Sequence, residues 1–172
     1  MFVTAISRIL LVASLVFPTL GFSDSIPIEP AAIRLLCPPE WETLDKNSLP
    51  DAAPNVCFPR IKMGQSRIDV VLWEQPESLN EAVDKYTSKM PGLLRKGATW
   101  KEISRGGFRA NSGVEGVRLR FSTTEMSDCG PRTTQLVRYV FKNRLGKIVC
   151  IGGIGDLEAI QGIVISSLEL TP

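Results

Sequence analysis

Residues 135–168 read QLVRYVFKNRLGKIVCIGGIGDLEAIQGIVISSL, and this stretch decides the fold. Two runs rich in β-branched and aromatic residues, 135–141 and 147–151, flank a short polar turn, which predicts an antiparallel β-hairpin. A glycine-rich exit leads to Asp156, whose carboxylate can cap the first turn of a helix that ends near Leu168. Three successive β-branched residues in that last segment lower its helix propensity, so a terminal strand is the alternative.

The chain before this hairpin contains one clear helix among several strand-like runs. Ser78 and Glu81 form the pattern of a capping box, and apolar residues at helical spacing continue as far as Pro91-Gly92. Strands are predicted where apolar and polar residues alternate, at 67–74, 99–104 and 117–123, and Gly106-Gly107 predicts a break after the second of them. Residues 124–134, TEMSDCGPRTT, predict a long loop that turns at Gly130-Pro131. This order of elements predicts an α+β fold, an antiparallel sheet with helices packed on it.

The N-terminal residues 1–23 have the pattern of a secretory signal peptide. Arg8 precedes a short apolar run that ends in small residues, with cleavage expected before Asp24. The run is shorter than the roughly 20 apolar residues that span a bilayer, although an uncleaved N-terminal anchor is the alternative. Residues 24–32 then predict a flexible lead-in and residues 33–172 a single globular domain, periplasmic or secreted.

Four cysteines, an even number in a chain expected to be exported, predict two disulfides. Proximity in the sequence favours Cys37–Cys57 and Cys129–Cys150, although the other two sets of pairings stay open. Each favoured bridge would close a loop of about 20 residues and contribute on the order of 3 kcal/mol on the loop-entropy model. A metal site is the poorer interpretation, because the chain has no histidine and no closely spaced cysteine pair.

The order of elements and several short motifs resemble the PsbP-like family. In the first half of the chain the motifs are a cysteine–proline–tryptophan entry at 37–41 and a Ser-Leu-x-Glu helix start after a strand at 78–81. In the second half they are a glycine before a strand at 116–117, an aromatic strand at 138–141, a glycine turn at 146–147 and a closing helix that ends at 166–168. The resemblance covers most of residues 33–170 and implies an α/β/α sandwich around the sheet. Familiar members of that family are non-catalytic, which implies a binding or assembly role.

The absence of histidine limits the possible catalytic and metal sites more than any other feature of the composition. It excludes Ser-His-Asp and Cys-His nucleophilic sites and the commonest zinc sites. A Ser–Lys dyad or a pair of carboxylates remains for an enzyme, and no local motif marks either. Residues 152–156 lack both the dinucleotide fingerprint and the lysine of a phosphate-binding loop, so we interpret them as a tight turn into a capped helix. We therefore predict no enzyme activity, no cofactor and no metal.

Charge is nearly balanced overall, with 20 Lys and Arg against 18 Asp and Glu, which argues against a nucleic-acid partner. If strands 117–123 and 135–141 pair, outward alternation is expected to place Arg118, Arg120 and Arg138 on one sheet face. Such a face could bind an acidic protein patch or a phosphate-bearing polymer. A solvated face whose arginine stems cover apolar sheet is the plainer alternative.

Three functions follow from these observations. The leading hypothesis is an exported, non-catalytic binding or assembly protein of the cell envelope or periplasm, with a protein partner of unknown identity and no membrane span after signal cleavage. The alternative is an inhibitor or immunity protein that plugs a secreted enzyme, with the 124–134 loop inserted into a cleft. The third is a hydrolase that works without histidine.

Overall fold

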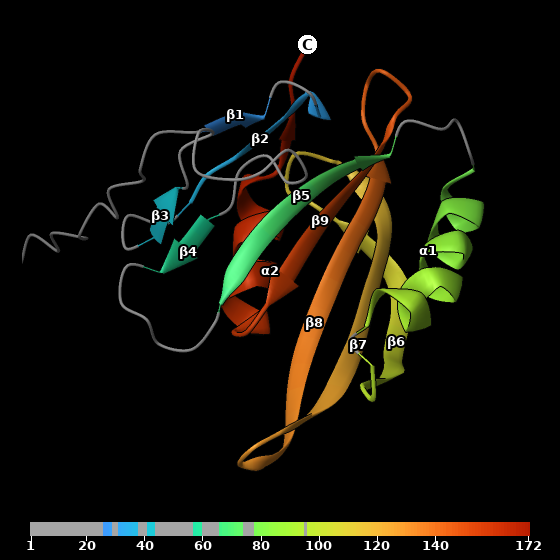
Figure 1. Ribbon diagram of the computed structural model, residues 1–172. Helices are drawn as coiled ribbons and strands as arrows, with labels where there is room; N and C mark the ends of the chain where they lie inside the picture. Colours follow the sequence, from blue (N-terminus) through green and yellow to red (C-terminus); the bar gives the residue numbers. More distant parts are fainter. Residues whose placement is uncertain are drawn as a thin grey trace, which may run out of the picture.

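The main sheet is organised around the hairpin of β8 (Gly130–Lys142) and β9 (Ile148–Ile154), shown in the computed structural model (Figure 1). The structure describes residues 26–28, 31–37, 41–43, 57–59, 66–73, 78–94 and 96–172. Asn143 fixes the hairpin turn, because its side-chain oxygen accepts hydrogen bonds from the backbone N–H groups of Leu145 (3.0 Å) and Lys147 (2.9 Å). The hairpin predicted from the sequence is confirmed.

Two sheets occur in the part of the chain that the structure describes, and every strand pairing in them is antiparallel. The seven-stranded main sheet has the order β3-β4-β5-β9-β8-β7-β6 and the small sheet the order β1-β2-β10. The remaining bounds are β1 Ile26–Ile28, β2 Ile33–Leu35, β3 Trp41–Thr43, β4 Cys57–Pro59, β5 Arg67–Trp73, α1 Leu79–Leu93, β6 Thr99–Arg109, β7 Glu115–Ser127, α2 Leu157–Ser167 and β10 Glu169–Leu170.

Alternate side chains of the main sheet fill one hydrophobic cluster on each face. Val149 and Ile151 of β9 lie in the cluster shared with α2 and the small sheet, whereas Ile148 and Cys150 lie in the cluster shared with α1. All four residues are at most 2% exposed, so β9 is buried on both faces. The two helices therefore cover opposite faces of the sheet (Figure 1). The predicted α+β class and the α/β/α sandwich are confirmed.

Helix α1 begins where the sequence predicts and ends slightly later. Ser78 Oγ accepts a hydrogen bond from the N–H of Glu81 (3.3 Å), and Glu81 Oε2 accepts one from the N–H of Ser78 (3.0 Å), which completes the capping box. Val83 and Met90 bury the predicted apolar stripe against the sheet. The expected end at Pro91 is wrong, because the helix continues through Pro91 to Leu93.

The last segment forms a helix rather than the alternative terminal strand. Asp156 Oδ1 caps α2 by accepting hydrogen bonds from the N–H groups of Glu158 and Ala159, each at 3.1 Å. Tertiary burial outweighs the weak helix propensity of its β-branched residues. The buried residues of α2 are Ile160, Ile163, Val164 and Ser167.

Two segments predicted to interrupt strands are continuous strand. Residues 124–134 are not a long loop, since β7 and β8 pair as far as Ser127 and Gly130 and leave a turn of Asp128 and Cys129. Gly130 takes a φ of 104°, which allows this tight reversal. The Gly106-Gly107 pair likewise stays within β6 and pairs with β7. The result is a long β7–β8 ribbon that projects beyond the other strands (Figure 1).

The predicted disulfide Cys129–Cys150 is wrong, because both cysteines are free thiols. Cys129 is exposed in the ribbon turn, whereas Cys150 is buried in β9 opposite Val140 of β8. About 11 residues of strand, or roughly 35 Å, separate Cys129 from that position, far beyond the ~4–7 Å between the Cα atoms of a disulfide. Cys37 is buried and disulfide-bonded. The side chain of Cys57 lies outside the described residues, so Cys57 stays its predicted partner.

The N-terminal segment contributes to the small sheet. Residues 26–28, which fall in the predicted flexible lead-in, form β1 and pair with β2. The predicted signal peptide, residues 1–23, lies outside the residues that the structure describes, and its cleavage stays a prediction. Neither α1 nor α2, the helices of the described residues, is both long and apolar enough to cross a membrane.

Candidate functional site

Two charged side chains lie in the layer between the main sheet and α1. Arg138 of β8 and Asp69 of β5 form an ion pair across β9, with 3.4 Å between Nη1 and Oδ1, and their side chains are only 14% and 19% exposed. Arg138 Nε also donates a hydrogen bond to the hydroxyl of Tyr86 on α1, at 3.0 Å. One partner on the sheet and one on the helix therefore hold the guanidinium in place.

This network keeps the guanidinium charged and the neighbouring thiol protonated. Burial disfavours the charged form of Arg138, but Asp69 and then Cys150 and Tyr86 raise the pKa of Arg138 above its ordinary value. Burial raises the pKa of Cys150 to about 12, although Arg138 opposes the shift. A protonated, buried thiol is inert as a nucleophile. The network is therefore a polar part of the core and not a reactive site.

The glycine run in β9 is explained by close packing on both of its faces. A β-carbon on Gly152 would lie 1.8 Å from Nη1 of Arg138 and 2.6 Å from Oδ1 of Asp69. A β-carbon on Gly153 would lie 2.6 Å from Cγ2 of Ile160 on α2. The glycines thus make room for the ion pair and for the helix. The interpretation of residues 152–156 as a turn into a capped helix is therefore right only for Gly155 and the Asp156 cap, because Gly152, Gly153 and Ile154 belong to β9.

The three arginines predicted to share one sheet face lie on two faces. In the β7–β8 register Leu119 pairs with Arg138, and Arg118 pairs with Tyr139. Directly opposed residues point to the same face, so Arg138 faces α1, whereas Arg118 and Arg120 face α2. The turn of Asp128 and Cys129 sets this register, because a two-residue turn pairs odd-numbered with even-numbered residues. The long loop predicted from the sequence did not contain that register.

The face that carries Arg118 and Arg120 forms a pocket against α2, which we call the α2 pocket. Its volume is about 600 Å³, and the residues that line it come from the sheet and from α2: Arg120, Val137, Tyr139, Leu157, Glu158, Gln161, Gly162, Ile165 and Ser166. Arg118 lies at its edge and donates a hydrogen bond from Nη1 to Oε1 of Gln161, at 3.0 Å. Of the three predicted arginines, the structure brings these two together at one site.

Two polar atoms of residues that line the α2 pocket have no hydrogen-bond partner in the described part of the chain. The hydroxyl of Tyr139 and Nε of Arg120 are buried without a hydrogen bond. Tyr139 is 0% exposed, and its ring packs edge-on against Phe108 with 5.1 Å between centroids. Burial raises the pKa of Tyr139 to about 12, against the opposing effect of Arg118 and Arg120, so its hydroxyl stays protonated at neutral pH. Buried polar groups are normally hydrogen-bonded, which makes this pair exceptional.

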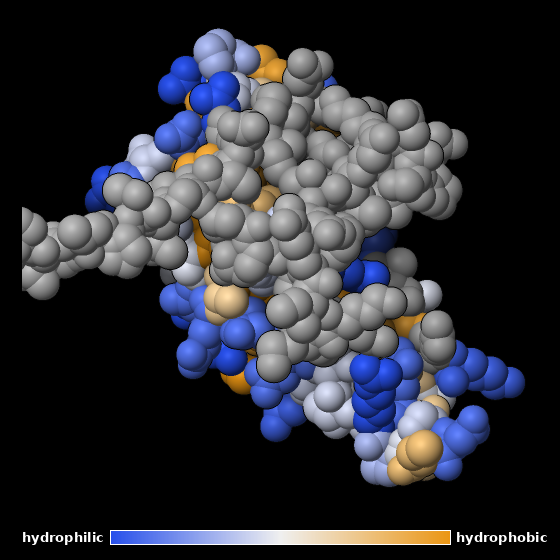
Figure 2. Space-filling model, turned by 90° about the vertical axis from the view of Figure 1, so that its left-hand side faces the viewer, coloured by the Kyte–Doolittle hydropathy of each residue, from blue (hydrophilic) through white to orange (hydrophobic). Residues whose placement is uncertain are grey.

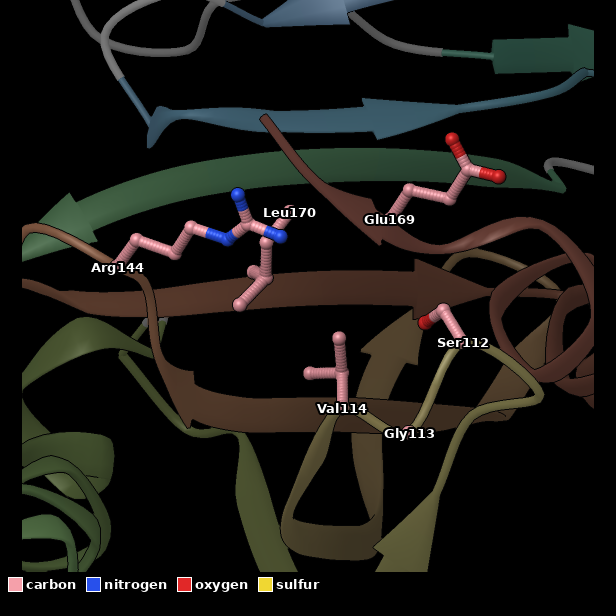
Figure 3. A pocket seen from close by; sticks show the side chains of 6 residues that line it. All are labelled: Ser112, Gly113, Val114, Arg144, Glu169 and Leu170. Atoms are coloured by element: carbon pink, nitrogen blue, oxygen red, sulfur yellow. The ribbon is translucent and has the colours of Figure 1, made fainter. Parts of the chain in front are cut away.

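A second pocket, of about 350 Å³, lies beside the C-terminal strand β10 (Figure 3). It is lined by Ser112, Gly113, Val114, Arg144, Glu169 and Leu170. Figure 3 shows that the carboxylate of Glu169 points away from the guanidinium of Arg144. The hydroxyl of Ser112 already donates to the carbonyl of Leu168. None of these lining side chains has a buried polar atom without a partner, so the α2 pocket is the stronger candidate.

The β7–β8 ribbon does not form a binding patch by itself. Met126 is 74% exposed on the ribbon, and the surface at the lower end of the molecule is mainly hydrophilic (Figure 2). A single exposed apolar side chain is common on protein surfaces and needs no partner. In the residues that the structure describes, no group of three or more His, Cys, Asp or Glu side chains is placed to hold a metal ion.

The element order and the layers define the class of protein: the chain has a PsbP-like fold. Among solved structures it is similar to the cyanobacterial PsbP of Synechocystis sp. PCC 6803, with a TM-score of 0.59 and 13% identity over 86% of this chain and 91% of that one. It is also similar to LpqN of Mycobacterium tuberculosis, a protein involved in cell envelope biogenesis, with a TM-score of 0.49 and 14% identity over 88% and 92%. Identities this low show the fold alone. No protein-family model matches the chain, and no curated protein matches it.

Proposed function

We propose that this chain is an exported, non-catalytic binding or assembly protein of the cell envelope or periplasm, and that the α2 pocket is its binding surface. The observation that carries the proposal is the pair of buried atoms without partners, the hydroxyl of Tyr139 and Nε of Arg120. Leaving such an atom unsatisfied costs about 1–3 kcal/mol. A ligand that supplies the missing acceptor removes that cost, which favours binding at this position.

The non-catalytic part of the proposal rests on the residues that are present. The chain has no histidine, so the usual general base at neutral pH is missing. The thiol of Cys150 is buried and protonated, and the carboxylate of Asp69 is held by Arg138. The side chains that remain at the α2 pocket can donate hydrogen bonds and attract negative charge, which suits recognition rather than turnover.

Export rests on the sequence of residues 1–23 and is tested by fractionation. We expect the protein outside the cytosol, with a mature N terminus near Asp24 by N-terminal sequencing. A cytosolic product that keeps Met1 would contradict export without affecting the argument for the pocket.

Site-specific photocrosslinking tests the binding surface. Ser166 lines the α2 pocket, is exposed, and donates its hydroxyl to the carbonyl of Gly162 at 2.7 Å. Ser88 on α1 is a matched control, because it is also exposed and donates to the backbone of its own helix, at Lys85. With a benzophenone side chain at each position, ultraviolet light in the native compartment is expected to give a discrete adduct from position 166 only. Equal adducts from both positions, or none from either, would contradict the proposal.

The inhibitor hypothesis keeps one observation in its favour, the projecting β7–β8 ribbon (Figure 1). An inhibitor would insert the ribbon into a cleft of its target enzyme. The same crosslinker at Met126, which is 74% exposed, separates the two functions. An adduct with a secreted enzyme from position 126, and none from position 166, would replace the leading proposal with this one.

A further inference from the structure

The two atoms without partners in the α2 pocket are both hydrogen-bond donors. Nε of Arg120 can only donate, and the hydroxyl of Tyr139 keeps its proton at neutral pH. Among the residues that the structure describes, no acceptor reaches either atom. The chemical group that completes the site is therefore one that offers acceptor oxygen atoms and no donors of its own.

The charges around these donors favour a negative ligand. Arg118 and Arg120 both act on the hydroxyl of Tyr139, and Arg118 is held at the pocket edge by its hydrogen bond to Gln161. Glu158 is the acidic residue among those that line the pocket, and it is exposed in the first turn of α2. The positive charges lie on the sheet and the negative charge on the helix.

The charge of the ligand distinguishes a carboxylate from a phosphate. A carboxylate brings one negative charge into the pocket, whereas a phosphate brings up to two, and both would lie near Glu158. The remaining lining of the pocket includes the apolar residues Val137, Leu157 and Ile165. These surfaces suit an apolar group next to the carboxylate.

We propose that the α2 pocket binds a carboxylate attached to an apolar group, presented by a partner protein, with Tyr139 and Arg120 as the donors. This inference rests on the proposed function and specifies the ligand chemistry of the same site. Both donor atoms are shielded from solvent, so the half-buried Arg120 side chain moves aside when the ligand enters. The carboxylate then accepts charge-assisted hydrogen bonds in a place that water reaches poorly.

A titration of the full chain by NMR tests the inference with three probes. N-acetyl-leucine carries a carboxylate and an apolar group, N-acetyl-leucinamide has the same apolar group without the charge, and inorganic phosphate has the charge without the apolar group. We expect N-acetyl-leucine to shift the Nε–H signal of Arg120 and the amide signals of α2, with affinity at least about 10-fold above that of either other probe. Equal or tighter binding of phosphate, or no shift at these signals, would overturn the inference.

Variants that keep the fold sharpen the test. Arg120→Met and Tyr139→Phe each remove the donor, and each is expected to weaken N-acetyl-leucine binding by about 10-fold. Glu158→Gln removes the opposing charge and is expected to strengthen binding. Arg105→Gln is the control, because Arg105 is tied to Glu102 and Asp84 away from the pocket. An equal loss in Arg105→Gln, or no loss in Tyr139→Phe, would contradict the assignment of the donors.

The result separates failure of this inference from failure of the proposed function. If position 166 gives a crosslinked partner while N-acetyl-leucine binds no better than its amide, the binding surface stands and the ligand chemistry is wrong. If position 166 gives no adduct, the proposed function fails as well.

Discussion

Removing one oxygen atom by the substitution Tyr139→Phe is expected to raise the free energy of unfolding by about 1 kcal/mol. The hydroxyl of Tyr139 is buried without a partner in the folded state, whereas water hydrates it in the unfolded state. That difference costs the folded protein about 1–3 kcal/mol, and the small void left by the missing oxygen offsets part of the gain. The ring keeps its edge-on contact with Phe108, so the fold is not disturbed.

Tyr86→Phe is the matched control, because it is the same chemical change and is expected to change the free energy of unfolding in the opposite direction. The hydroxyl of Tyr86 accepts a hydrogen bond from Nε of Arg138 at 3.0 Å, in a partly buried position. Its loss leaves a charged donor without this acceptor and is expected to lower the free energy of unfolding by about 1–3 kcal/mol. Urea denaturation, monitored by far-ultraviolet circular dichroism, measures the free energy of unfolding of both variants. The melting temperature should rise by about 2–4 °C for Tyr139→Phe and fall for Tyr86→Phe.

The two variants together can refute the reasoning. If Tyr139→Phe lowers the free energy of unfolding as much as Tyr86→Phe does, the hydroxyl of Tyr139 has a hydrogen-bond partner in solution. The α2 pocket would then lack its unpartnered donor, and the proposal built on that donor would lose its main support.

Three further predictions concern the glycines, the thiols and pH. Gly152→Ala should lower the free energy of unfolding by about 3 kcal/mol or more, because the new β-carbon displaces the Arg138–Asp69 ion pair. Gly162→Ala, in the interior of α2, meets nothing within 4 Å and should raise the free energy of unfolding by about 0.5–1 kcal/mol, and urea denaturation measures both variants. A thiol reagent should modify Cys129 in the native protein and Cys150 only after unfolding; equal rates would contradict the assigned burial. Burial raises the pKa of the Cys150 thiol from 9.0 to about 12, so the thiol loses its proton at a lower pH in the unfolded state than in the folded state. The free energy of unfolding is therefore highest below pH 9.0 and falls as the pH rises toward 12. Cys150→Ala should make that fall shallower by about 1.4 kcal/mol per pH unit, measured by denaturation at several pH values, and an unchanged slope would contradict it.

Local patterns in the sequence predict the elements that depend on neighbouring residues. The hairpin around Asn143, the capping box at Ser78 and the cap at Asp156 all use contacts within a few residues, and all three are confirmed. Strand length was harder to predict, because Gly106-Gly107 and Gly130-Pro131 are typical turn signals that here lie within or at the start of paired strands.

The candidate site depends on relations between strands, which the pattern within one strand does not contain. Alternation gives the two faces of β7 and of β8 separately, but only the register relates them, and it places Arg138 opposite Leu119. The prediction of the Cys129–Cys150 disulfide failed for the same reason, since these two cysteines are near in sequence and a whole strand apart in space. The unpartnered hydroxyl of Tyr139 depends on how α2 packs on the sheet, so no sequence signal could reveal it.

Reversing the charge of the α2 pocket is the most direct measurement of its role. Arg118→Glu combined with Arg120→Glu, in the protein that carries the crosslinker at position 166, should keep the melting temperature within a few degrees, because neither arginine belongs to a buried ion pair among the described residues. The yield of the adduct should fall at least about 10-fold, since the ligand then meets two negative charges. A folded double variant that gives an unchanged yield of adduct would show that the partner does not use this pocket.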